Sequence, residues 1–199
     1  MLLRTAATLA TLVVSAGVPA ASLSLQGLLA ADNPNDVAVI EFETKAAAAL
    51  DAQTWSFGGG TNAAGQAIAA GGFDTYVSLF AGWGGSATFM ASNDDGLCPP
   101  GTAAPACADS TLRITALPAG RYTIAVSQPA NFSFAENLGA GTLGDGFIGL
   151  AGSWSGGACT ASCSSAYALD ITSSALVPEP AAPLLLALGL LALRLKRRD

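Results

Sequence analysis

The stretch TLRITALPAGRYTIAVS, residues 111–127, carries the strongest fold signal in the chain. Apolar and polar residues alternate on both sides of a short insert, Pro118-Ala119-Gly120, which is rich in turn-forming residues. A hydrophobic period of two is typical of a strand with one buried face. The stretch therefore predicts two strands joined by a tight turn. The side chains predicted to point into a core are Leu112, Ile114, Ala116, Tyr122, Ile124 and Val126.

Short segments of the same kind occupy most of the central part of the chain. They cover residues 37–42, 53–57, 75–81, 86–91, 131–135 and 166–171. Gly82-Trp83-Gly84-Gly85 lies between two of these segments and predicts a hairpin. Residues 45–50 indicate one or two turns of helix. We expect an all-β fold, namely an antiparallel β-sandwich or jelly roll of about eight or nine strands.

The N-terminus has the pattern of a signal peptide. Arg4 precedes an apolar run over residues 5–14, and the small residues of Val18-Pro19-Ala20 favour cleavage after Ala20 or one residue later. The apolar run is shorter than the roughly 20 residues that span a membrane. We therefore expect a signal peptide over 1–21 and a β domain over 22–175, about the size of a single domain.

The C-terminal tail, residues 176–199, combines three features. Val177-Pro178-Glu179-Pro180 holds an acidic residue between two prolines, which restrict the backbone to extended conformations. The apolar run 181–193 predicts a hydrophobic transmembrane helix, although it is short for a full span. A basic cluster follows and is expected to stay on the cytoplasmic side of the inner membrane. It consists of Arg194, Lys196, Arg197 and Arg198.

This tail resembles the sorting tail of PEP-CTERM proteins, in which the residues matching Pro178, Glu179 and Pro180 form the signature. The resemblance implies that an exosortase, a membrane cysteine-type transpeptidase, recognises and removes the tail during export. It also implies a Gram-negative bacterium that makes exopolysaccharide, an inner-membrane intermediate and a final location at the cell surface or outside the cell. It implies no particular activity for the domain itself.

The domain between these ends is acidic. The chain has 8 Lys and Arg and 14 Asp and Glu residues, of which the two end segments hold five and two. Three basic and twelve acidic residues remain, which gives the domain a net charge near −9. Such a domain lacks the basic surface that binds nucleic acid or anionic lipid. Cations, calcium above all, are the charged partners that suit it.

Four cysteines, Cys98, Cys107, Cys159 and Cys163, stand in two groups. An even number in an exported chain favours disulfides. Of the three pairings that are open, we favour Cys98–Cys107 and Cys159–Cys163, because each pair brackets one loop of small residues. A zinc site is disfavoured because the chain has no histidine.

The order of segments in residues 73–127 resembles the bacterial pre-peptidase C-terminal domain. The resemblance rests on residues 73–80, Asn93-Asp94-Asp95-Gly96 and residues 109–112 and 117–126, and an insertion over 97–108 departs from the family pattern. It implies a non-catalytic accessory β-sandwich of secreted proteins, and some relatives bind calcium.

Asn93-Asp94-Asp95-Gly96 is the sharpest polar cluster in the chain. Oxygen ligands of this kind suit calcium, and Asp74 and Asp109 would join them if their strand ends converge. The candidate ligands are therefore Asp74, Asp94, Asp95 and Asp109. The alternative is that these side chains cap turns by bonding to the nearby backbone.

The remaining chemistry points away from catalysis. Without histidine, Ser-His-Asp and Cys-His mechanisms are excluded, and Glu41 and Glu43 are expected to be a solvated pair on one strand face. Trp83, flanked by glycines, is a candidate carbohydrate-binding residue, whereas Trp55 is expected in the core. We expect a non-enzymatic exported surface or extracellular-matrix protein associated with exopolysaccharide or biofilm. The alternative is a carbohydrate-binding module on the cell's own polysaccharide.

Overall fold

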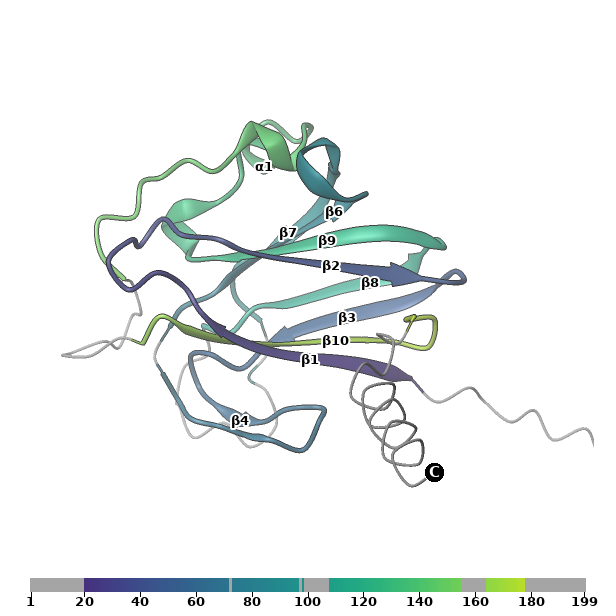
Figure 1. Cartoon of the computed structure of the whole chain (residues 1–199), viewed down its shortest axis with the longest axis horizontal. Coiled ribbons are helices and arrows are strands. Elements are labelled where there is room, and N and C mark those ends of the chain that lie inside the picture. The colour runs from purple at the N-terminus through teal and green to yellow at the C-terminus, as the bar shows by residue number, and fades with distance from the viewer. Residues whose placement is uncertain (1–19, 72, 97, 99–107, 155–163, 178–199) are drawn as a thin grey trace, which may run out of the picture.

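The computed structural model describes residues 20–71, 73–96, 98, 108–154 and 164–177. Within them the chain forms two four-stranded antiparallel sheets and one two-stranded hairpin (Figure 1). Sheet A has the strand order β1-β10-β3-β8, and sheet B has the order β2-β9-β6-β7. The strands are β1 (Ala21–Leu28), β2 (Ala38–Thr44), β3 (Ala48–Thr54), β4 (Gly60–Thr61), β5 (Ala67–Ile68), β6 (Tyr76–Ala81), β7 (Thr88–Asn93), β8 (Thr111–Leu117), β9 (Gly120–Ser127) and β10 (Ala166–Ser173).

The two large sheets share one apolar core, to which alternate residues of their strands contribute. Leu50 and Ile171 of sheet A and Leu79 and Ile124 of sheet B are at most 2% exposed. Burial of each such side chain stabilises the fold by about 1.5–3 kcal/mol. The alternation along the chain therefore determines which face of each sheet packs inward.

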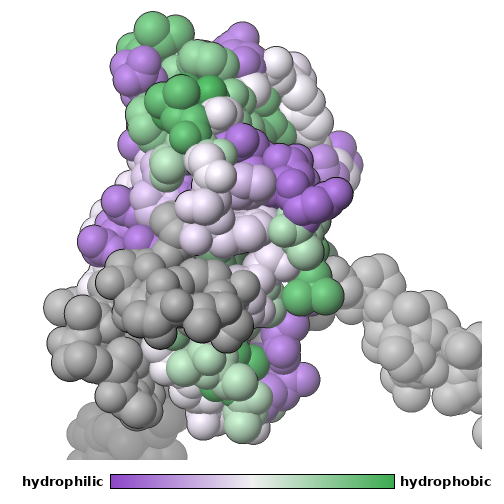
Figure 2. Space-filling view, turned by 90° about the vertical axis from the view of Figure 1, so that its left-hand side faces the viewer, coloured by the Kyte–Doolittle hydropathy of each residue, from purple (hydrophilic) through white to green (hydrophobic). Residues whose placement is uncertain are grey.

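A second apolar cluster lies on the outer face of sheet B. It joins Phe80 and Ala125 of the sheet to Ala135 of the short helix α1 (Phe134–Asn137), and Phe147 packs beside it. For this reason β6 and β9 are buried on both faces. In Figure 2 apolar surface gathers at the top of the molecule, on the same side as α1, whose Phe134 is 41% exposed. Three 3₁₀ turns complete the described elements, at Gly84–Ser86, Pro129–Asn131 and Leu143–Asp145.

The prediction of a β-rich antiparallel fold is confirmed. The segment after Gly82-Trp83-Gly84-Gly85 returns as β7, which pairs antiparallel with β6, as the hairpin signature predicted. Trp55 and Phe57 are buried, at 8% and 7% exposed, also as predicted. The four inward-facing predictions Leu112, Tyr122, Ile124 and Val126 are at most 5% exposed.

Three local predictions are wrong. Residues 48–54 form strand β3 and not a helix, because Leu50, Ala52 and Thr54 are buried with the period of two that is typical of a strand. The expected strand over 53–57 ends at Thr54 and turns. The expected strand over 131–135 is instead a 3₁₀ turn followed by α1, whose first turn is capped by Ser133, which accepts a hydrogen bond from the Glu136 N–H at 3.2 Å.

Pro118-Ala119-Gly120 makes a turn, but the two strands that it connects belong to different sheets. β8 pairs with β3 in sheet A, whereas β9 pairs with β2 and β6 in sheet B. The β3–β8 register shifts between Ala48 and Leu50, which is the mark of a β-bulge. As a result Ala116, predicted to point inward, is exposed, and Leu117 enters the core in its place.

β1 was not predicted as a strand, and it begins at Ala21, next to the expected signal-peptide cleavage point. Cys98 is disulfide-bonded, and the other cysteines of the predicted pairings, Cys107, Cys159 and Cys163, lie outside the described residues. The predicted signal peptide up to residue 19, the Pro178-Glu179-Pro180 motif, the apolar run and the basic cluster lie outside them as well. No helix in the part of the chain that the structure describes is long and apolar enough to cross a membrane.

Candidate cation site and the Trp83 surface

Three of the four predicted calcium ligands come together at one end of sheet B. Asp74 precedes β6, and Asp94 and Asp95 follow β7, where Val77 pairs with Asn93. Because β6 and β7 are antiparallel neighbours, the start of one strand meets the end of the other. Each of the three carboxylates offers one oxygen, and these oxygens lie within 4.8 Å of one another.

The loop that carries Asp94 is held in place by the start of β8. The Ser110 hydroxyl lies within hydrogen-bonding distance of the carbonyls of Thr75, Asn93 and Asp94. The Thr111 N–H donates to Asn93 Oδ1 at 2.8 Å. The fold thus fixes the backbone on both sides of the carboxylates. The Asn93 side chain thus helps to hold this turn.

Burial and neighbouring negative charges raise the pKa of Asp74 and of Asp94. Burial raises the pKa of Asp74 from 3.8 to about 7, with further contributions from the negative charges of Asp94, Asp95 and Asp109. Burial, followed by repulsion from Asp95, also raises the pKa of Asp94. The Asp74 Oδ1 atom is buried and has no hydrogen-bond partner. A cation at this point would supply the missing partner and offset the repulsion.

Asp109, the fourth predicted ligand, serves a different purpose. It is fully buried, and its two oxygens accept the backbone N–H groups of Phe57 and Gly58 at 3.0 and 2.8 Å. The Thr54 hydroxyl adds a third hydrogen bond, at 3.1 Å. Asp109 therefore caps the turn after β3, which lies 51 and 52 residues away in the sequence, and not a turn of its own loop as the alternative interpretation expected. It is not a member of the carboxylate cluster.

The donor set of Asp74, Asp94 and Asp95 suits a hard divalent cation. Calcium takes six to eight oxygen ligands in flexible geometry, and carboxylates are its usual protein ligands. Three carboxylates supply at least three of these oxygens, and solvent would supply the rest because Asp94 and Asp95 are exposed. The unpartnered Asp74 oxygen is the feature that fits such an ion best.

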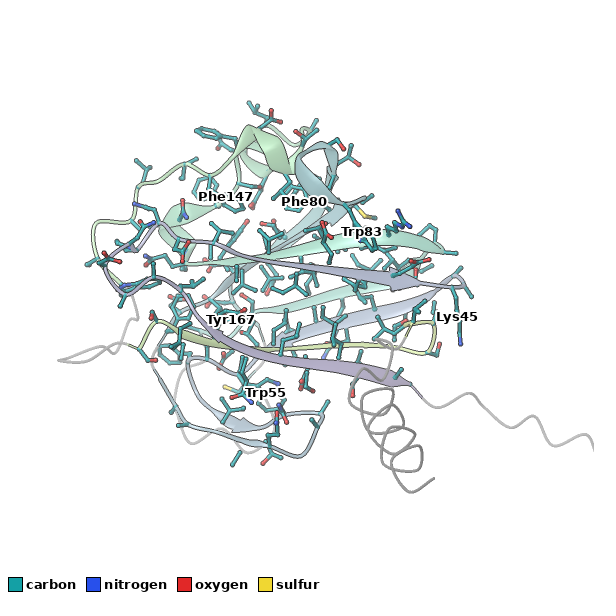
Figure 3. The ribbon with its side chains drawn as sticks, in the orientation of Figure 1. Lys45, Trp55, Phe80, Trp83, Phe147 and Tyr167 are labelled. Carbon is teal, nitrogen blue, oxygen red and sulfur yellow. The ribbon has the colours of Figure 1, made fainter. Side chains whose placement is uncertain are left out.

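Trp83 lies at the surface, but it is not a free-standing ring. It is 38% exposed, and its Nε1 donates to the Phe42 carbonyl at 3.3 Å. The Arg121 guanidinium stacks on the ring, with its Cζ 4.2 Å from the ring centroid. Figure 3 shows Trp83 beside sheet B, far from Trp55, which lies near the β4–β5 hairpin below sheet A.

The surroundings of Trp83 are polar and charged. Glu41 Oε1 accepts the Gly84 N–H at 3.1 Å, and Glu43 lies 3.9 Å from Arg121. Sequence reasoning singled out Trp83 but missed Arg121, because Trp83 lies in the turn between β6 and β7, whereas Arg121 lies on β9. The register that places Glu43 opposite Arg121 on β2 and β9 brings the group together.

No protein-family model matches the chain, and no curated protein matches it.

Proposed function

We propose that the chain is an exported, non-enzymatic surface or extracellular-matrix protein whose tail is removed by an exosortase. In this proposal the two-sheet body is a β-sandwich accessory domain that remains outside a Gram-negative cell. The apolar C-terminal segment holds the protein in the inner membrane until it is cut. Exopolysaccharide or biofilm matrix is the proposed surrounding, and nucleic acid is not a partner because the domain is acidic.

The observation that carries this proposal is where the fold begins and ends relative to the two processing points. β1 begins at Ala21, and Ala21 pairs with Ser173. At the other end the Val177 N–H donates to the Glu43 carbonyl at 2.9 Å. The paired strands thus reach to both proposed cleavage points, and cleavage after Ala20 and before Pro178 would keep Ala21 and Val177 in these pairings.

The proline at the start of the tail supports the same boundary. Proline is found in sheets essentially only at edges and bulges, so Pro178 disfavours continuation of the extended pairing beyond Val177. Leu176, just before, is 5% exposed and belongs to the main core. Among the described residues, the core thus extends to Leu176, which stands two positions before Pro178 in the sequence.

Mass spectrometry of the protein from fractionated producer cells tests the proposal. We expect a surface or extracellular form that begins at Ala21 or Ser22 and lacks the basic C-terminus. Glu179→Ala should accumulate with its tail intact in the membrane fraction, while Leu186→Val, which leaves the motif unchanged, should be processed like the parent. Normal processing of Glu179→Ala would refute exosortase recognition, and an intact Met1 in a cytosolic fraction would refute export.

A second candidate function, carbohydrate binding, is favoured by the geometry of Trp83. Its hydrogen bond to Phe42 and its contact with Arg121 fix the ring before any ligand arrives, and fixed aromatic rings bind at low entropic cost. Binding to the cell's own polysaccharide should be lost in Trp83→Ala and kept in Trp154→Phe. Equal binding by the parent and Trp83→Ala would remove this candidate.

A further inference from the structure

The four outer strands of the two sheets differ in how their edges are protected. On β7, Phe89 donates to the Gly141 carbonyl, and Thr142 forms a bridge with Thr88. On β2, Glu43 and Lys45 form backbone hydrogen bonds with Val177 and Ala175. β8 carries a bulge and the charged Arg113. Natural sheets use such devices to prevent edge-to-edge pairing.

β1 has none of these devices. Its sequence, ASLSLQGL, contains no charged residue and no proline, and all eight residues pair with β10 without a register shift. Within the described residues, no backbone hydrogen bond reaches its outer edge. In Figure 1 the edges of β1 and β2 face the viewer. A long, regular and uncharged edge of this kind is a template for another strand.

The outward backbone groups of β1 can be identified from its register. The Leu29 N–H donates to the Ser165 carbonyl at 3.0 Å, so Leu29 faces β10. Backbone direction alternates along a strand, and the odd-numbered residues of β1 therefore face β10. The N–H and C=O groups of the even-numbered residues point outward. These residues are Ser22, Ser24, Gln26 and Leu28.

The side chains next to this edge leave apolar surface uncovered. Leu23 and Leu25 pack against the main core but are only partly buried. Ala38 and Ile40 of β2 also pack against this core and are also only partly buried. Leu28, at the end of β1, is 77% exposed. A strand added to β1 would cover Leu23 and Leu25 as well as satisfy the backbone.

We propose that β1 pairs antiparallel with β1 of a second copy of this chain, in a register centred on Leu25. Ser24 then lies opposite the second copy's Gln26, and Ser22 lies opposite its Leu28. Every outward N–H and C=O group of both strands finds a partner, and the two Leu25 side chains meet on the core side. Sheet A becomes one continuous sheet across a two-fold axis.

The self-complementarity of β1 is what favours a second copy over an unrelated strand. In the register centred on Leu25, each strand opposes only uncharged residues, and the two partly buried Leu25 side chains cover each other. No like charges oppose each other within the strand pair, although each chain carries a net charge of −6. Repulsion between the acidic bodies is screened by salt, so raising the ionic strength should strengthen the association.

Cysteine cross-linking tests both the pairing and its register. Facing residues of a non-hydrogen-bonded antiparallel pair have Cβ atoms about 4.5–5.5 Å apart, near enough for a disulfide after small adjustments. Leu25→Cys lies on the two-fold axis and should form a disulfide-linked dimer under mild oxidation. Leu23→Cys is the matched control, because the two copies of residue 23 would be roughly 13 Å apart. Cross-linking of neither variant, or of both equally, overturns the proposal.

Sedimentation velocity on the purified chain supplies a second readout. The parent should dimerise with rising concentration, and Gln26→Pro should weaken the dimer at least about tenfold, because it removes an outward N–H without touching the β1–β10 ladder. An unchanged circular dichroism spectrum would confirm that Gln26→Pro folds. If this variant does not fold, the comparison of Leu25→Cys with Leu23→Cys decides the question. A parent that stays monomeric at its highest soluble concentration refutes the pairing.

Discussion

Replacement of Asp74 by asparagine should have opposite effects with and without calcium. The pKa of Asp74 rises from 3.8 to about 7 on folding. A group whose pKa is raised in the folded state stabilises the fold at low pH, and this contribution is lost as the pH rises from about 4 to about 7. At pH 7.5 without calcium, Asp74→Asn should therefore be more stable than the parent, whereas near pH 4 the two should be alike.

The size of the effect follows from the shift. About three pKa units correspond to a ceiling of about 4 kcal/mol. Asp74 is only half-buried, and solvent screening reduces this figure to roughly 1–2 kcal/mol. In a domain of this size, such a change should raise the melting temperature by about 3–6 °C.

Thermal melts with and without millimolar calcium make the comparison. Calcium at one hundred times its Kd should stabilise the parent by about 2.7 kcal/mol, and Asp74→Asn should lose most of that gain. Asp32→Asn is the matched control, because Asp32 is exposed and lies outside the cluster. If Asp74→Asn melts like the parent without calcium, Asp74 does not destabilise the fold at pH 7.5. If the variant keeps the full response to calcium, Asp74 is not a calcium ligand.

Three further substitutions test the structure itself. Asp109→Asn should lower the free energy of unfolding, measured by urea titration, by about 2–3 kcal/mol. The reason is that an amide cannot accept all the N–H groups that the carboxylate accepts. A loss of less than about 0.5 kcal/mol would contradict this role. Gly27→Ala should lower the free energy of unfolding by about 1–3 kcal/mol, because a Cβ at this position would lie 2.5 Å from the Tyr167 hydroxyl. Gly152→Ala is the control and should be neutral, because nothing lies within 4 Å of a Cβ there. Equal stability of the two variants would argue against this packing. Trp55→Phe removes the hydrogen bond of 2.8 Å from the Trp55 indole to the buried carboxylate of Asp170. It should lower the free energy of unfolding by about 1–2 kcal/mol in the same titration. An unchanged free energy of unfolding would contradict this.

Local alternation predicted most of the strands but not their partners. The period-two pattern of residues 111–127 identified β8 and β9, yet nothing in Pro118-Ala119-Gly120 indicates that the chain crosses from one sheet to the other there. The alanine-rich residues 45–50 favoured a helix by propensity, but burial of Leu50 and Ala52 in the sheet outweighed it. β1 could have been predicted, because residues 22–26 alternate serine or glutamine with leucine.

The site was predictable only in part, for a related reason. Asp94 and Asp95 are neighbours in the sequence, and Asp74 joins them through the β6–β7 pairing that the hairpin signature indicated. Asp109 carries the same side chain, and only its buried surroundings distinguish its capping role from that of a ligand. The contact of Arg121 with Trp83 depends on strand order, which residue patterns do not encode.

The opposition of Ala21 and Ser173 has a consequence for secretion. The first and last paired residues of sheet A, Ala21 and Ser173, lie opposite each other at one end of the sheet. A polypeptide still tethered to the bilayer at both termini could close its sheets without threading either tether through the body. Under the proposed function, the two cleavages could therefore occur in either order, and folding need not wait for the first of them.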